Sequence, residues 1–201
     1  MTGSWMTDSA LEKLEIFTEM VLRYGRSFTS HDTKEELWNL SIVDSAIGWS
    51  LVNECVQKPK RVIDVGSGAG FPAIVIAILS PDVDVYAVEK KKKAAFFMEM
   101  VKDRLGLSNF FVISDDIRNV DIRGAIITSR AVAPISRFLA LLIDKNLDAI
   151  FLWKGPSWKK EMNGVSVWYP FCVKEYSLTH RREQKTRYII GLRRYEEKEA
   201  E

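Results

Sequence analysis

A glycine-rich turn directly after a short apolar run constrains this chain more than any other feature. Residues 61–65 read Arg-Val-Ile-Asp-Val, and glycines follow at positions 66, 68 and 70. β-Branched residues in a short apolar run predict a strand buried on both faces. Glycine lets a ligand approach the backbone closely, and Phe71-Pro72 then opens a helix over 73–79, where proline suits the first turn. This order of strand, turn and helix predicts a site for a nucleoside-bearing cofactor.

The glycine spacing separates two kinds of cofactor. Dinucleotide-binding turns follow the pattern G-x-G-x-x-G, and Phe71 stands here in place of the third glycine. The observed G-x-G-x-G is typical of class I methyltransferases, which bind S-adenosylmethionine. A β-rich run over 83–88 ends on Glu89, whose carboxylate can accept hydrogen bonds from both ribose hydroxyls of either cofactor. The spacing disfavours a nicotinamide cofactor, and an ordinary structural turn remains the alternative.

The rest of the chain predicts an α/β fold with an N-terminal helical extension. Amphipathic helices are expected over residues 1–56, beginning near Asp8 or Ser9 and again at a capping box formed by Thr33 and Glu36. Strands and helices then alternate across 57–195. The later strands are expected at 110–113, 125–128 and 148–152, with a terminal hairpin of 165–169 and 187–192. Seven strands in this order predict the doubly wound, Rossmann-like sheet of a class I S-adenosylmethionine-dependent methyltransferase, followed by a charged tail at 196–201.

Composition excludes several classes of protein. The 201 residues have a net charge of +2, and no apolar run reaches about 18 residues, so we expect no membrane span and a cytoplasmic location. Cys55 and Cys172 lie far apart, with neither a metal-ligand spacing nor a disulfide framework, which favours a reducing compartment. We expect no bound metal and a monomeric protein.

Further candidate site residues lie where later strands end, because ligands of α/β sheets collect at the carboxyl ends of the strands. Near 115–118, Asp116 could accept from an adenine amino group while Ile117 packs on the ring, or the aspartates could simply cap a turn. Arg130 could bind the cofactor carboxylate or a substrate phosphate; its alternative is a surface salt bridge. Trp153 and Trp158 either pack in the core or stack on bases.

The stretch after the fourth strand also limits the methyl acceptor. Enzymes that methylate exocyclic amines typically carry Asn or Asp followed by Pro-Pro-aromatic there, whereas this chain has Arg-Ala-Val-Ala-Pro over 130–134. Neither cysteine stands where a carbon-5 cytosine enzyme needs its nucleophile. The remaining acceptors are nucleophilic without deprotonation, such as N7 of guanine, for which orientation alone suffices. If RNA is the substrate, we expect a basic surface of residues 90–93, Lys154, Lys159, Lys160, Arg181 and Arg182.

These motifs resemble one bacterial family. GSGAGFP at 66–72, SRAVAP at 129–134 and LWKG at 152–155, together with ELW and IVDS in the helical region, are similar to the small-subunit (16S) ribosomal RNA guanine-N7 methyltransferases of the glucose-inhibited division protein B family. The resemblance implies methyl transfer from S-adenosylmethionine to a guanine of 16S ribosomal RNA, free or in the 30S subunit. The expected cofactor-binding residues are Gly66, Ser67, Gly68, Gly70, Phe71, Glu89, Asp116, Ile117, Arg118 and Arg130. Arg130 is also the expected catalytic residue.

One departure from the family pattern falls on the substrate side. The family usually has Arg-His where this chain has Leu40 and Ser41. Two alternatives therefore stay open: a methyltransferase acting on another RNA or a small molecule, and a non-catalytic RNA-binding assembly protein on the same fold.

Overall fold

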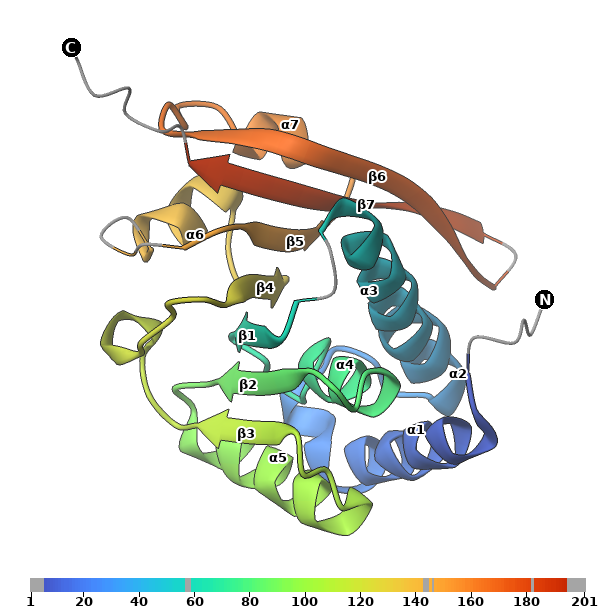
Figure 1. The fold of residues 1–201 in the computed structure, drawn as a ribbon. Helices are drawn as coiled ribbons and strands as arrows, with labels where there is room; N and C mark the ends of the chain where they lie inside the picture. The colour runs from blue at the N-terminus through green and yellow to red at the C-terminus, as the bar shows by residue number, and fades with distance from the viewer. Residues whose placement is uncertain (1–5, 57–58, 143–144, 146, 182, 195–201) are drawn as a thin grey trace.

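A seven-stranded sheet with the order β3-β2-β1-β4-β5-β7-β6 forms the centre of the molecule (Figure 1). The computed structural model describes residues 6–56, 59–142, 145, 147–181 and 183–194. The first five strands are parallel, and β7 pairs antiparallel with β5 and β6. This arrangement confirms the predicted fold. The strands are β1 (Arg61–Val65), β2 (Asp84–Val88), β3 (Phe110–Ile113), β4 (Ile126–Arg130), β5 (Ile150–Lys154), β6 (Trp168–His180) and β7 (Glu183–Arg194).

Two hydrophobic cores lie on opposite faces of this sheet, because successive side chains of β1 such as Val62 and Ile63 point to opposite sides. One core is shared with α1 (Asp8–Met20), α3 (Asp44–Cys55), α4 (Ala73–Leu79) and α5 (Lys92–Leu105). The other is covered by η4 (Ile117–Asn119), α6 (Ile135–Ala140) and α7 (Trp158–Glu161). Helix α4 packs against α1 and α3 as well as the sheet, which explains why it is apolar all round.

The N-terminal helices differ in detail from the prediction. Thr7 caps α1, in place of Asp8 or Ser9, because its hydroxyl accepts from the amide of Ala10 at 3.2 Å. The capping box before α2 (Lys34–Leu37) is half formed, since Thr33 accepts from the amide of Glu36 at 3.2 Å. Between α1 and α2 lie a π-helical turn, η1 (Val21–Gly25), and a 3₁₀ turn, η2 (Arg26–Phe28). A second π-helical segment, η3 (Trp38–Val43), joins α2 to α3.

The C-terminal hairpin is much longer than predicted. The expected strands at 165–169 and 187–192 are replaced by the longer strands β6 and β7, which extend to a tip at Arg181. At this tip Arg181 forms an ion pair with Glu36 of α2 at 3.0 Å, so the hairpin also covers the N-terminal helices. Residues 196–201, the expected charged tail, lie outside the described part of the chain.

The prediction that the two cysteines are unpaired is wrong. Cys55, at the end of α3, and Cys172, in β6, form a disulfide, with their Cα atoms 6.1 Å apart. The two cysteines are 117 positions apart, and no spacing pattern in the sequence indicated that they pair. The bond adds a covalent link between α3 and the hairpin.

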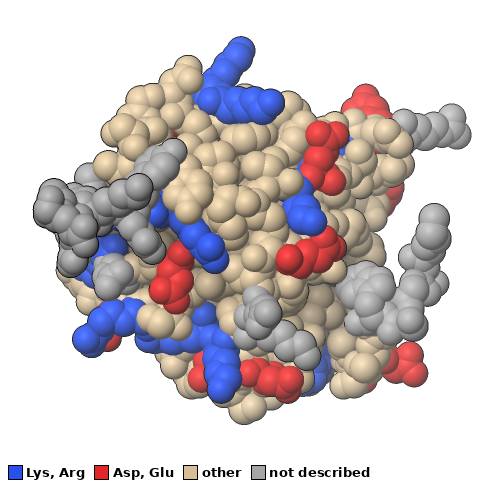
Figure 2. Space-filling model, turned by 45° about the horizontal axis from the view of Figure 1, so that its top comes forward, with Lys and Arg blue, Asp and Glu red and all other residues tan. Residues whose placement is uncertain are grey.

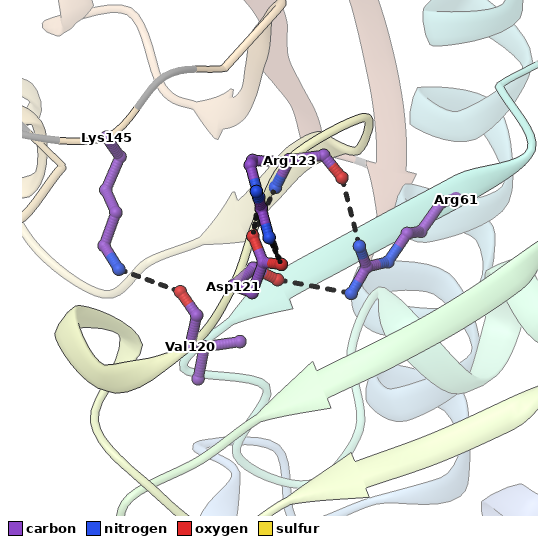
Figure 3. A network of polar contacts seen from close by, with 5 residues as sticks. All are labelled: Arg61, Val120, Asp121, Arg123 and Lys145. Carbon is purple, nitrogen blue, oxygen red and sulfur yellow. Dashed lines mark hydrogen bonds and ion pairs between the residues drawn. The ribbon is translucent and has the colours of Figure 1, made fainter.

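A polar network fixes the segment between η4 and β4 (Figure 3). Arg61 donates to the carbonyl oxygens of Arg123 and Asp121 at 3.0 and 3.2 Å, and Lys145 donates to the carbonyl of Val120 at 2.8 Å. Backbone groups that would otherwise lack partners are thereby satisfied.

Within the described residues, none of the helices combines the length and hydropathy that a membrane crossing needs.

Candidate active site

A cavity of about 570 Å³ lies where β1, β2 and β4 end, a volume suited to a small-molecule ligand. All the sequence-predicted cofactor residues line it except Gly70. The amide of Gly70 instead donates to the carbonyl of Ser67 at 2.7 Å, and a β-carbon on Gly70 would collide with the side chain of Ile74. Gly70 therefore shapes the turn. The other lining residues are Phe28, Thr29, Ser30, Val65, Ala69, Val88, Lys90, Lys91, Ala94, Asp115, Ala131, Val132 and Leu141.

The glycine turn forms one wall of this cavity. Gly66 has a φ of +73°, which favours glycine, and a β-carbon there would collide with Val132. A β-carbon on Gly68 would lie 3.3 Å from the carbonyl oxygen of Phe28. The turn thus keeps open a space that side chains would fill, as a cofactor cradle requires.

Glu89 stands opposite the turn and holds it in place. Its carboxylate accepts from the amide of Gly68 at 3.0 Å and from the amide of Lys91 at 2.9 Å. A carboxylate has about four acceptor sites, so two remain after these bonds. Glu89 therefore keeps acceptor sites for two adjacent ribose hydroxyls, and this role stays a prediction.

The turn after β3 supplies an apolar wall and an ion pair. Ile117 is buried at the cavity, whereas Arg118 donates from Nε and Nη2 to Asp116, each at 2.9 Å. These hydrogen bonds lower the pKa of Asp116 to about 2. Asp116 also caps η4 by accepting from the amide of Arg118. The capping role that the sequence suggested for an aspartate is confirmed, and the turn lines the cavity, whereas contact with adenine stays a prediction.

Arg130 lines the cavity, and its guanidinium group is held by hydrogen bonds to residues of η3 and α3. Its Nη1 donates to the carbonyl of Leu40 at 3.1 Å and to the carboxylate of Asp44 at 3.2 Å, and its Nη2 donates to the hydroxyl of Ser41 at 3.0 Å. The guanidinium also lies over the ring of Phe71, 5.1 Å from its centroid. Of its five N–H groups, the bonds to described residues leave two for a ligand. The side chain is therefore no surface salt bridge.

Asp44 is the centre of a buried polar cluster that the sequence analysis missed. Its side chain is 4% exposed and accepts from the hydroxyl of Tyr176 at 2.7 Å, with Nε of Arg187 3.9 Å away. Its carbonyl accepts from the indole of Trp153 at 3.1 Å, so Trp153 belongs to the core. The position of Asp44 in the IVDS stretch was the available signal. Trp158 is also buried, so stacking on bases is excluded for both tryptophans in this conformation.

A second buried acid, Asp64, lies in β1 two residues before Gly66. Its Oδ1 accepts from Thr128 at 2.9 Å, and Oδ2 has no partner among the described residues. Burial raises the pKa of Asp64 to about 7. A carboxyl group beneath the glycine turn is therefore close to half protonated near neutral pH.

Lys154 does not belong to a basic surface, which corrects the prediction. It is buried, donates to the carbonyl of Ala133 and pairs with Glu161, both at 2.7 Å. Glu161 in turn accepts from the amide of Ile135 at 3.1 Å. These bonds fix the segment after β4, in which Ala131 has a φ of +56° and Val132 reaches the cavity.

The other predicted basic residues have different environments. Lys159 and Lys160 are exposed, as are residues 90–93, whereas Arg181 is engaged by Glu36 and residue 182 lies outside the described chain. On the face shown in Figure 2, Lys and Arg are interspersed with Asp and Glu. Of the residues in the predicted basic surface, Lys90 and Lys91 line the cavity.

The arrangement fits S-adenosylmethionine and non-covalent chemistry. The turn leaves space for the cofactor, Glu89 offers acceptors for ribose hydroxyls, and Ile117 offers an apolar contact for adenine. Neither cysteine lines the cavity, and both are held in the disulfide. Among the described residues there is no group of three or more acidic, histidine or cysteine side chains placed to hold a metal ion.

Comparisons with known proteins agree with this description. The family model described as rRNA small subunit methyltransferase G matches residues 10–190. A ribosomal RNA small subunit methyltransferase G from Borrelia hermsii is 31% identical over 158 residues, covering 76% of this chain and 75% of that protein. The protein of that name from Borrelia duttonii is 30% identical over 194 residues, 94% of this chain and 91% of its own.

A solved structure supports the fold alone. The magnesium protoporphyrin IX methyltransferase from Synechocystis with bound SAM has a TM-score of 0.59 and 12% identity, covering 96% of this chain and 100% of that one. The shared fold is thus that of a methyltransferase.

Proposed function

Because the chain belongs to the rRNA small subunit methyltransferase G family, we propose that it transfers a methyl group from S-adenosylmethionine to N7 of a guanine in 16S ribosomal RNA. The observation that carries this proposal is the cavity at the strand ends, which the glycine turn, Glu89 and Ile117 all line. When bound, S-adenosylmethionine supplies an electrophilic methyl group.

Orientation of the acceptor is the main task of this chain's own residues. N7 of guanine carries a lone pair, so no side chain has to remove a proton before it can react. Glu89 would hold the ribose of the cofactor and Ile117 its adenine. Arg130 has two N–H groups free of described partners, and they would bind the cofactor carboxylate or a phosphate of the RNA.

The segment after β4 would form the wall beside the target base. Ala131 turns the chain in the left-handed region so that Val132 closes over Gly66. Such strained positions persist where surrounding contacts hold them, and here Lys154 and Glu161 do so from behind. Arg130, the proposed catalytic residue, would then act next to an apolar surface formed by this segment.

We further propose a monomeric, cytoplasmic enzyme in which residues 57–195 form the methyltransferase unit and residues 1–56 the helical extension. Its substrate would be the small-subunit RNA or the 30S subunit. The proposed RNA substrate supports the cytoplasmic location, whereas the disulfide between Cys55 and Cys172 removes the support that unpaired cysteines would have given. Leu40 and Ser41, which stand where the family usually has Arg-His, both accept hydrogen bonds from Arg130. The helical extension therefore contributes directly to the active site.

The test is methyl transfer from labelled S-adenosylmethionine to unmodified small subunits and to stripped RNA. Chemical cleavage at N7-methylguanine should map the label to a single guanine. Glu89→Gln should weaken cofactor binding and transfer together, while Glu99→Gln, at an exposed position of α5 away from the cavity, should leave both unchanged. Cofactor binding without label on either RNA would reject the proposed reaction in favour of another acceptor.

A further inference from the structure

Two aromatic side chains near the residues that line the cavity are exposed, although aromatic side chains usually pack in the core. Phe96 on α5 is 68% exposed, and Tyr24 on η1 is 51% exposed. The two elements are in contact, because Gly25 packs against the ring of Phe97, where a β-carbon would lie 2.9 Å away. Each exposed ring is therefore the sequence neighbour of a residue in this contact.

Cations accompany both rings. Lys92 and Lys93 are exposed and stand four and three residues before Phe96, so they share its face of α5. The guanidinium of Arg23 lies over the ring of Tyr24, 5.2 Å from its centroid. We refer to Arg23, Tyr24, Lys92, Lys93 and Phe96 as the aromatic–lysine face.

The helix itself gains nothing from these lysines. A helix N-terminus favours negative charge, yet the first turn of α5 has no acidic residue. Positive charge at this place weakens the helix slightly, so a partner outside the helix accounts for it better. A polyanion is such a partner.

The aromatic–lysine face adjoins the mouth of the cavity. Lys90 and Lys91, which directly precede the α5 lysines, line the cavity, and so do Phe28 and Ser30, which follow η1 closely. Phe28 also packs near Phe97, with ring centroids 6.0 Å apart. A chain that left the cavity on this side would reach the lysines first and the two rings next.

We propose that this face binds unpaired nucleotides adjoining the methylated guanine, with bases stacked on Phe96 and Tyr24 and phosphates next to Lys92 and Lys93. This inference rests on the proposed function. Exposed aromatic rings interleaved with basic residues are the means by which proteins hold single-stranded nucleic acid. The charge of the lysines favours RNA over an apolar protein partner.

The test measures kinetic constants with unmodified stripped RNA. Phe96→Ala should raise the KM for RNA about tenfold, with kcat and cofactor affinity unchanged, and Phe96→Trp should restore the KM. Val173→Ala is the matched control, because Val173 is 43% exposed on β6, at the other end of the sheet. Lys92→Ala and Lys93→Ala should each reduce the slope of log affinity against log salt by about one.

The outcomes separate this inference from the proposed function. A wild-type KM in Phe96→Ala, with wild-type methyl transfer intact, would overturn the stacking role. A raised KM with assembled subunits but not with stripped RNA would assign the face to a protein of the subunit and also overturn it. Absence of transfer by the wild-type protein would instead reject the proposed function.

Discussion

Replacing Arg130 by alanine should destabilise the fold as well as stop methyl transfer. The change removes the ion pair with Asp44 and the hydrogen bonds to Leu40 and Ser41. Asp44 would keep the hydroxyl of Tyr176 at 2.7 Å but would have only Arg187, 3.9 Å away, as a cation. Breaking a buried ion pair from one side costs about 3–5 kcal/mol. Since Asp44 keeps a hydrogen bond and Arg130 is 16% exposed, we expect about 3 kcal/mol.

Urea denaturation followed by tryptophan fluorescence measures this loss, since the chain has six tryptophans. Asp44→Asn in the Arg130→Ala background should recover part of it, with a coupling free energy of about 1–3 kcal/mol in a double-mutant cycle. Arg130→Lys should retain most of the stability but lose transfer, because lysine lacks the planar fork. A loss below about 1 kcal/mol in Arg130→Ala, or no coupling to Asp44, would refute the reasoning.

Three further changes test other parts of the structure. Gly66→Ala should lower the free energy of unfolding by about 1–2 kcal/mol, because alanine is strained at a φ of +73° and meets Val132, and it should weaken cofactor binding measured by calorimetry. Unchanged values for both would contradict the tight turn. The pKa of Asp64 is raised from 3.8 to about 7, so the native state keeps its proton between these values while the unfolded state loses it. The free energy of unfolding should therefore fall by about 3 kcal/mol from pH 4 to pH 7, and Asp64→Asn should remove that fall; equal pH slopes in denaturation curves would argue against it. Reductant should lower the Tm of the wild-type protein but not that of Cys55→Ser, because the link to Cys172 closes a long loop; a Tm insensitive to reductant in both would show that the bond does not form in solution.

The parts of the fold that could be predicted are those specified by neighbouring residues. Val62, Ile63 and the following glycines determine a strand and a turn within a few positions, so β1, the cofactor turn and the role of Glu89 at the end of β2 could be expected. The parallel order of the strands follows from their alternation with helices. These features need no information about distant parts of the chain.

The features that sequence analysis missed depend on distant partners. Lys154 has the charge of a surface residue, but Ala133 and Glu161 satisfy its ammonium group inside the protein. Asp44 and Arg130 are 86 positions apart, and nothing near either residue identifies the other. The extent of β6 and β7 was underestimated because nearly every residue from 177 to 187 is polar or charged, and pairing between the two strands overrides that local signal.

The Asp44 cluster also has a consequence for the order in which the protein becomes active during its synthesis. Asp44 lies in the first quarter of the chain, whereas Tyr176 comes 132 positions later, on the hairpin that completes the sheet. When the ribosome has synthesised every residue that lines the cavity, the nascent chain still lacks both Tyr176 and Arg187. The polar cluster around Asp44 and the guanidinium of Arg130 is therefore complete only after the last strand has left the ribosome. Premature stop codons at positions 142 to 187 therefore keep every residue that lines the cavity but remove Arg187, and those up to position 176 also remove Tyr176.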